Sequence, residues 1–101
     1  MREQKVLTLT KILFSNRASK NLIAQAKYIY EQTNSVELSD KYLNKMKTFI
    51  VEMLSKFPKS GRPSEQLAPN TRKFVYQGFS IIYRLSGERV EILTIYRENL
   101  P

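Results

Sequence analysis

The stretch KFPKSGRPSEQLAPN, residues 56–70, divides the chain into two parts with different hydrophobic patterns. Pro58, Gly61 and Pro63 interrupt a helix and are typical of turns and loops, so one element has to end here. Before this stretch, apolar residues recur every three or four positions, which indicates helices. After it, runs of aromatic and β-branched residues alternate with turn residues, which indicates strands. The chain therefore has to combine a helical layer with a sheet.

The helical part begins with an amphipathic segment. Ser15 or Asn16 is a candidate N-cap for a helix that starts at Arg17 and is broken at residues 33–35. One face of this helix is apolar, at spacings of three and four. Its apolar positions are Ala18, Leu22, Ala26, Ile29 and Tyr30.

A second amphipathic segment follows at once. Asn34 with Glu37 three residues later resembles a capping box, and the helix it starts runs to about Phe57. A continuous apolar stripe follows this segment and consists of Tyr42, Leu43, Met46, Phe49, Ile50, Met53, Leu54 and Phe57. Two such helices with a short link predict a helical hairpin.

The strand part contains three runs, and a fourth run precedes the helices. They cover residues 72–76, 79–85 and 89–96, and residues 7–14 (LTLTKILF). Gln77-Gly78 and Ser86-Gly87-Glu88 are turn material between the last three strands. The predicted fold is therefore α+β with the order β-α-α-β-β-β, in which the last three strands form an antiparallel meander and the sheet packs on the helical hairpin. A chain of 101 residues allows one domain, 1–101, with residues 1–6 as a loose N-terminal extension.

The composition excludes several kinds of site. The chain has no cysteine and no histidine, which removes disulfides, thiolate metal sites and every Ser-His or Cys-His arrangement. We find no phosphate-binding glycine loop, no zinc-ligand spacing and no paired carboxylates, and we expect neither a metal nor a cofactor. Any catalysis would have to use Lys, Arg, Tyr or carboxylate side chains.

The net charge of +8 favours an acidic or polyanionic partner, although solubility alone is the alternative reading. No apolar run has transmembrane length, and residues 1–10 lack the apolar core of a signal peptide. We therefore expect a cytoplasmic protein without a membrane partner.

Charged residues on the predicted strands indicate a candidate site. Because alternate residues of a strand share a face, Arg72, Arg84 and Arg97 can cluster on or around the open side of the sheet. Arg62 can reach the same edge from the preceding loop, and Lys73 follows Arg72 directly. Such a cluster can bind phosphates or carboxylates through paired hydrogen bonds. The alternative, that these are scattered surface residues, stays open.

The order of elements and several local patterns resemble the ParE/RelE superfamily of toxins from bacterial type II toxin–antitoxin modules. The resemblance runs from about Leu9 to Arg97. The first-helix pattern is SNRASKNLIAQAKYIYEQ, and the turn at the end of the second helix is LSKFPKSGRP. The hairpin that begins with an arginine is TRKFVYQGFSIIYRL, and the closing strand is VEILTIYRENL. The resemblance implies a basic toxin that a cognate antitoxin neutralises through a partly disordered, acidic segment, with operator DNA bound only through the antitoxin.

The superfamily has two branches, and Ser80 bears on the choice between them. In the ribonuclease branch, which cuts mRNA on the ribosome, a catalytic arginine commonly follows the aromatic residue that begins the third strand. Here Phe79 holds the aromatic place and Ser80 the arginine place, and serine offers no guanidinium to a developing phosphorane charge. The chain also ends at Pro101 without the basic, tyrosine-containing tail of many ribonuclease members. The resemblance thus favours the ParE branch, which poisons DNA gyrase and has no catalytic residues.

On this reading the target-binding candidates are Arg62, Arg72, Lys73, Arg84, Tyr96 and Arg97. If the chain is instead a ribosome-dependent mRNA endoribonuclease, its catalytic candidates are Arg72, Arg84, Tyr96 and Arg97. A third alternative is a diverged, non-toxic member that still binds its antitoxin. The resemblance also implies a role in plasmid stabilisation and growth inhibition.

Overall fold

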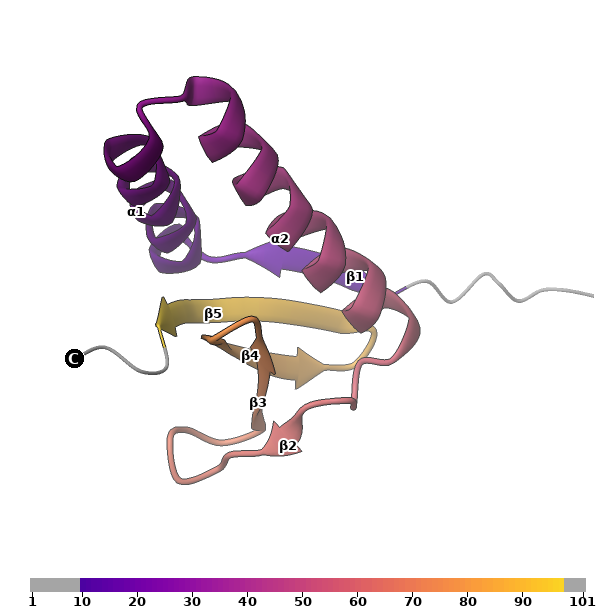
Figure 1. The fold of residues 1–101 in the computed structure, drawn as a ribbon. Helices are drawn as coiled ribbons and strands as arrows, with labels where there is room; N and C mark the ends of the chain where they lie inside the picture. The colour runs from indigo at the N-terminus through magenta and orange to yellow at the C-terminus, as the bar shows by residue number, and fades with distance from the viewer. Residues whose placement is uncertain (1–9, 98–101) are drawn as a thin grey trace, which may run out of the picture.

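The structure, a computed structural model, describes residues 10–97. Its elements are β1 (Lys11–Phe14), α1 (Asn16–Thr33), α2 (Val36–Lys56), β2 (Arg62–Pro63), β3 (Thr71–Tyr76), β4 (Phe79–Ser86) and β5 (Arg89–Arg97). The two helices form a hairpin on one side of a five-stranded sheet with the order β1-β5-β4-β3-β2 (Figure 1). The predicted α+β fold is confirmed. The expected N-terminal extension, residues 1–6, and the first residues of the expected strand 7–14 lie outside the described range.

Serine side chains start both helices. The Ser15 hydroxyl accepts a hydrogen bond from the Ala18 N–H at 3.0 Å, and the Ser35 hydroxyl accepts one from the Leu38 N–H at 3.1 Å. Asn34 instead ends α1, in the left-handed conformation (φ 57°), and its N–H donates to the Tyr30 carbonyl. The predicted capping box that starts at Asn34 is therefore wrong by one residue. Asn34 is the C-cap of α1, and the next residue, Ser35, is the N-cap of α2.

The last three strands form the predicted antiparallel meander. Gln77 (φ 46°) and Gly78 (φ 85°) both have positive φ at the two-residue β3–β4 turn, the backbone that suits the twist of a hairpin. Two strand pairings go beyond the sequence prediction. β1 pairs in parallel with β5, and β2 adds a two-residue antiparallel strand at the opposite edge.

A bulge interrupts the β4–β5 pairing. Ile82 lies opposite Thr94 and Tyr83 lies opposite Ile92, so Leu93 is the extra residue of β5. Leu93 therefore does not share a face with Ile95, although simple alternation along the strand would predict it, because one inserted residue shifts the alternation of side chains.

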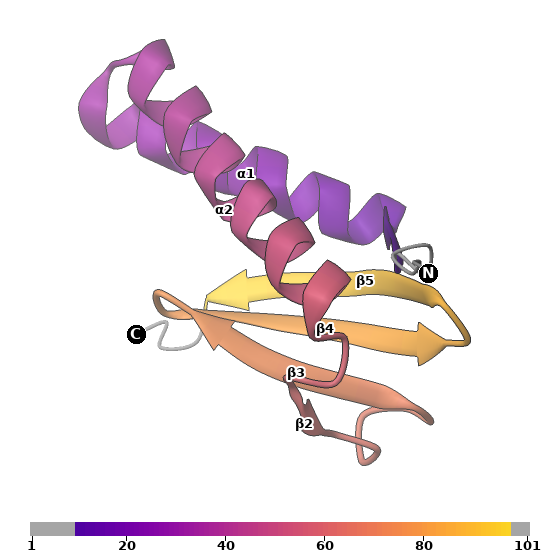
Figure 2. The ribbon, with the colours of Figure 1, turned by 90° about the vertical axis from the view of Figure 1, so that its right-hand side faces the viewer.

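The core lies between the helical hairpin and one face of the sheet, which we call the helix face. Its fully or nearly fully buried side chains are Ala18, Leu22, Met46, Ile50, Leu54, Phe79, Ile81, Tyr83, Val90, Ile92 and Ile95. Both helices lie on this one side (Figure 2), and the opposite side of the sheet is called the open face below. Of the predicted stripe of the second helix, Met46, Ile50 and Leu54 are buried and Phe57, at its end, is 60% exposed; the other four residues are partly buried. None of the helices in the described range is long and apolar enough to cross a membrane.

Candidate functional site on two faces of the sheet

Strand register distributes the predicted site residues over both faces of the sheet. Arg72 lies opposite Tyr83 and Arg97 lies opposite Phe79, and both partners belong to the buried core, so these two arginines are on the helix face. Arg84 lies opposite Thr71 and directly follows Tyr83 in β4. Successive side chains of a strand point to opposite faces, so Arg84 belongs to the open face.

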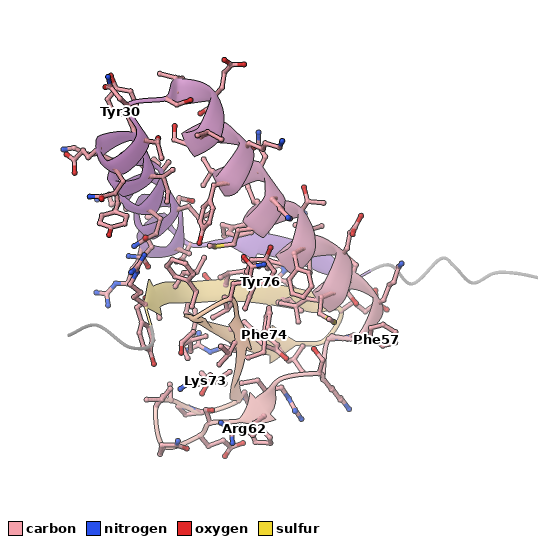
Figure 3. The ribbon with its side chains drawn as sticks, in the orientation of Figure 1. Tyr30, Phe57, Arg62, Lys73, Phe74 and Tyr76 are labelled. Atoms are coloured by element: carbon pink, nitrogen blue, oxygen red, sulfur yellow. The ribbon has the colours of Figure 1, made fainter. Side chains whose placement is uncertain are left out.

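The remaining candidates also lie on the open face. Lys73 lies opposite Ile82, Tyr96 lies opposite Ser80, and Arg62 pairs with Lys73. In Figure 3, Phe74 and Tyr76 point toward α2, whereas Lys73 and Arg62 lie below, away from the helices. The predicted clustering of Arg72, Arg84 and Arg97 on one side is thus wrong.

Arg72 holds the loop that follows α2 through hydrogen bonds to its backbone. Its Nη1 donates hydrogen bonds to the carbonyl oxygens of Gly61 at 2.6 Å and Lys59 at 3.2 Å. Next to it, the fully buried Tyr83 hydroxyl accepts from the Gly61 N–H and donates to the Pro58 carbonyl, both at 2.8 Å. Burial raises the pKa of Tyr83, although the Gly61 N–H, the Ser60 side chain and the Arg72 charge act in the opposite direction. We call Pro58, Lys59, Gly61, Arg72 and Tyr83 the loop bracket.

Only glycine fits at position 61 of the loop bracket. A Cβ atom there would lie 2.7 Å from the Tyr83 hydroxyl oxygen and 2.9 Å from the Lys73 carbonyl oxygen. Both distances are shorter than ordinary van der Waals contact. The glycine in the turn Pro58-Lys59-Ser60-Gly61-Arg62 is therefore required by packing, namely by the close approach of this loop to β3 and β4.

The open face carries a groove of about 420 Å³. It is lined by Ser15, Arg17, Leu67, Ala68, Thr71, Ile82, Leu93, Thr94 and Tyr96. Leu67 and Ala68, in the loop before β3, form one wall. The Thr71 hydroxyl holds this loop in place: it lies 2.6 Å from the Ser64 carbonyl oxygen and 2.8 Å from that of Ala68, and it donates to one of them at a time. We call this cavity the open-face groove. Its lining surface is mostly apolar, and Arg17 is its one charged residue.

Sequence reasoning missed Arg17 and Leu67 as part of this surface. They come from the start of α1 and from the loop before β3, far apart in the chain, and only the tertiary fold brings them together. The contact that brings Arg17 here is also tertiary: the capping residue Ser15 donates its hydroxyl to the Leu93 carbonyl at 2.9 Å and so ties the start of α1 to β5.

The polar side chains of the open face differ in their exposure and in their partners. Ser80 is 0% exposed, so its hydroxyl is not accessible from this face. Arg84 faces Glu91 at 3.9 Å, in an ion pair whose two side chains are 41% and 44% exposed and which adds little stability. Within residues 10–97, no group of three or more acidic side chains is placed to hold a metal ion.

The helix face ends in a second, smaller hollow beside Arg97. Its volume is about 200 Å³ and its lining consists of Tyr42, Gln77, Gly78, Phe79 and Arg97. The Arg97 guanidinium carbon lies 5.0 Å from the centre of the Tyr28 ring and 5.6 Å from that of the Phe79 ring. Burial raises the pKa of Tyr42, and the nearby Arg97 charge acts against that rise. We call this cavity the Arg97 hollow.

Comparison with known proteins identifies what the chain is similar to. The family model described as "ParE toxin of type II toxin-antitoxin system, parDE" matches residues 12–99. Toxin ParE3 of Caulobacter vibrioides is 36% identical over 64 residues. That match spans 63% of this chain and 63% of the relative, so it covers less than two thirds of the length of that toxin.

Solved structures share the fold. A chain of the chromosomal ParDE toxin–antitoxin system from P. aeruginosa aligns with a TM-score of 0.72 at 24% identity, over 91% of this chain and 99% of that one. A chain of the RelBE2 toxin–antitoxin complex from Mycobacterium tuberculosis aligns with a TM-score of 0.65 at 18% identity, over 88% and 98%. A chain of the intact E. coli RelBE complex gives 0.56 at 14% identity, over 90% and 99%.

Proposed function

Because the chain belongs to the ParE toxin family of type II toxin–antitoxin systems, we propose that it is a toxin that inhibits DNA gyrase by binding it. On this proposal the protein acts in the cytoplasm, forms and breaks no covalent bond itself, and is held inactive by a cognate antitoxin. Loss of the antitoxin would release the toxin and stop growth, which is how such a pair stabilises a plasmid.

One observation carries the choice of a binding protein over a ribonuclease. The four residues that would have to act together on RNA are divided between the two faces of the sheet: Arg72 and Arg97 on the helix face, and Arg84 and Tyr96 on the open face. General acid–base and electrostatic catalysis require their groups within hydrogen-bond reach of one reacting centre. In addition, Arg72 already donates to two backbone carbonyls. Gyrase inhibition by binding has no such requirement.

The open face is the surface we assign to the target. Arg62, Lys73, Arg84 and Tyr96 share it, and Arg17 lines the open-face groove. An apolar groove with cations around it suits a protein surface that presents an apolar side chain next to acidic ones. Arg72, also a candidate from the sequence, supports this surface indirectly by fixing the loop that leads to it.

The test uses purified protein with DNA gyrase and plasmid DNA. We expect loss of supercoiling and accumulation of cleaved DNA that remains bound to gyrase, and we expect added antitoxin to reverse both. Tyr96→Ala and Arg17→Ala should weaken the effect about tenfold each, since residues central to an interface commonly contribute this much or more. Arg89→Ala, at the other end of β5, is the control. Unchanged supercoiling at a large excess of toxin would refute the proposal.

Ribosome-dependent mRNA cleavage is a second candidate, favoured by the gathering of Arg62, Lys73, Arg84 and Tyr96 on one face. It predicts cleaved mRNA in a translation extract and no effect on gyrase. A protein that affects neither gyrase nor translation and leaves growth unchanged would fit the third possibility, a diverged member that only binds its antitoxin.

A further inference from the structure

The start of α1 takes the place of a neighbouring strand beside part of β5. β1 pairs with β5 only as far as Ile92, so among the described residues the next part of β5 has no strand partner on that side. Two side chains bind its backbone there instead. The Ser15 hydroxyl donates to the Leu93 carbonyl at 2.9 Å, and the Ile95 N–H donates to the Asn21 side-chain oxygen, also at 2.9 Å. This edge of β5 is therefore held by the first turns of α1.

The same part of β5 contains the bulge, and the bulge shapes the open-face groove. Leu93 and Thr94 follow each other in the chain and both line the groove, although successive side chains of a regular strand point to opposite faces. The extra residue of a bulge changes the direction of side chains in this way. The hydrogen bonds from Ser15 and Asn21 bind the backbone on either side of Thr94, so they hold the bulge in its shape.

Asn21 also fixes the side chain of Thr94. Its Oδ1 atom accepts a second hydrogen bond, from the Thr94 hydroxyl at 3.1 Å. A backbone N–H can only donate, so the amide of Asn21 has to present its oxygen to Ile95. Because the Thr94 hydroxyl is turned toward α1, its methyl group is left to line the groove. Asn21 thus acts on the groove through Thr94 and the bulge, without lining the groove itself.

The other two small hydroxyl side chains of the lining also donate within the protein. The Ser15 hydroxyl donates to the Leu93 carbonyl, and the Thr71 hydroxyl donates to a carbonyl of the loop before β3. The hydrogen atoms of all three hydroxyls therefore point to acceptors of the fold. A wall without free hydroxyl donors suits an apolar group, since a polar group would lose its hydrogen bonds to water without replacing them.

We propose that Asn21 is a positioning residue that decides what the open-face groove accepts. By holding the bulge and the Thr94 hydroxyl, it makes the groove a site for one apolar side chain, with Arg17 as the charged group of the lining. That this side chain belongs to DNA gyrase rests on the proposed function, whereas the apolar preference and the role of Asn21 do not.

The first experiment uses the protein alone and two probes of almost the same shape, toluene and phenol, which differ by a methyl and a hydroxyl group. Each is titrated into protein with 13C-labelled methyl groups, and the signals of Ile82 and Leu93 report occupation of the groove. We expect the wild type to bind toluene about tenfold more tightly than phenol, because the phenol hydroxyl finds no partner in the groove. Asn21→Ala should reduce this preference to about twofold, because the Thr94 hydroxyl is then free to turn into the groove and bind phenol. An equal preference in both proteins, or no shift of either signal with toluene, would overturn the proposal.

Further variants separate positioning from a loss of stability. Asn21→Asp keeps an oxygen acceptor of the same shape and should restore the preference for toluene. The double variant Asn21→Ala with Thr94→Val has no hydroxyl to release, so it should regain the preference as well. A purely structural role of Asn21 would not be repaired by a second substitution that removes a further polar group, and failure of both variants to recover the preference would contradict the proposal. Asn21→Gln displaces the oxygen by one methylene group, and it should reduce the preference too if Asn21→Ala folds poorly.

The second experiment measures inhibition of gyrase supercoiling. We expect Asn21→Ala to require about tenfold more protein than the wild type, as for the loss of a central contact. Ser35→Ala is the control, because it removes one capping hydrogen bond just beyond the other end of α1 and should inhibit like the wild type. Equal inhibition by Asn21→Ala and the wild type would overturn the inference. If the wild type leaves gyrase unaffected while the probes behave as expected, the proposed target fails and the positioning role of Asn21 stands.

Discussion

Arg72 and Arg97 both lie on the helix face of the sheet, but their guanidinium groups meet different surroundings. Arg72 donates to two backbone carbonyls in the loop bracket, at 2.6 Å and 3.2 Å. Arg97 touches the Tyr28 and Phe79 rings and, within the described residues, no carboxylate. Within residues 10–97, the fold uses N–H groups of Arg72 as donors to backbone carbonyls, whereas the contacts of Arg97 are with aromatic rings. The comparison shows that position on a strand does not decide whether an arginine is structural. What decides it is where its N–H groups find acceptors.

Gly61→Ala tests the tightness of the loop bracket and should have the largest effect. The new methyl group would meet the Tyr83 hydroxyl at 2.7 Å and the Lys73 carbonyl at 2.9 Å, so the loop has to move and both arginine and tyrosine hydrogen bonds weaken. We expect the free energy of unfolding to fall by about 3 kcal/mol in urea titrations. Gly87→Ala is the control: it has positive φ (63°) but nothing within 4 Å, and should cost only about 1 kcal/mol. Equal losses would mean that the contact at position 61 is unimportant.

Tyr83→Phe removes one hydroxyl from the loop bracket and leaves the buried Gly61 N–H without its acceptor. We expect the unfolding free energy to fall by about 2 kcal/mol, the cost of an unsatisfied buried group. Tyr96→Phe, on the open face where Tyr96 is 41% exposed, should change stability by less than about 0.5 kcal/mol. A similar small change in both variants would contradict the assignment of the Tyr83 hydroxyl to the bracket.

The direct comparison of the two arginines comes next. Arg72→Ala should lower the unfolding free energy by about 1.5 kcal/mol, because two charge-assisted hydrogen bonds to the loop are lost. Arg97→Ala should lower it by only about 0.5 kcal/mol, the value of a partly exposed cation–π contact. Thermal unfolding of both variants beside the wild type measures the difference. Arg97→Ala losing as much stability as Arg72→Ala would show that Arg97 is structural too.

The smallest expected effect is a pH dependence. Burial raises the pKa of Tyr83 above its usual 10.0, so the folded state holds the neutral phenol more tightly than the unfolded state does. This stabilisation is present in full below pH 10 and is lost as the pH rises above 10 through the folded-state pKa. The unfolding free energy of the wild type should therefore fall more steeply above pH 10 than that of Tyr83→Phe. The slope left in the variant comes partly from Tyr42, whose pKa burial also raises. Parallel curves would exclude a contribution from Tyr83.

The sequence was sufficient to predict the helical hairpin and the meander, because periodicity and turn residues are local signals. It could not predict the parallel pairing of β1 with β5 or the two-residue strand β2, since neither has a local signature. Nor could it predict the bulge, which one extra residue, Leu93, introduces.

The same limit explains the errors about the site. Alternation within β3 puts Arg72 on the same face as Phe74 and Tyr76, but which face of the sheet that set occupies depends on the register with β4. Arg72 therefore belongs to the core side, and Arg84 does not. The open-face groove combines the start of α1, a loop and two strands, so no single stretch of sequence identifies it.

The parallel pairing of the first and last strands has a consequence for synthesis of the protein. β1 meets residues 89–92 of β5, and the Ser15 hydroxyl reaches a carbonyl 78 residues further along the chain. At roughly 5 to 20 residues per second, the ribosome takes roughly 4 to 16 seconds to supply that partner after Ser15 has been made. Until then β1 has no strand to pair with, so the closure of the long loop between β1 and β5 is a late step of folding. The growing chain thus lacks its finished sheet, with both faces and the Arg97 hollow, until β5 has been made.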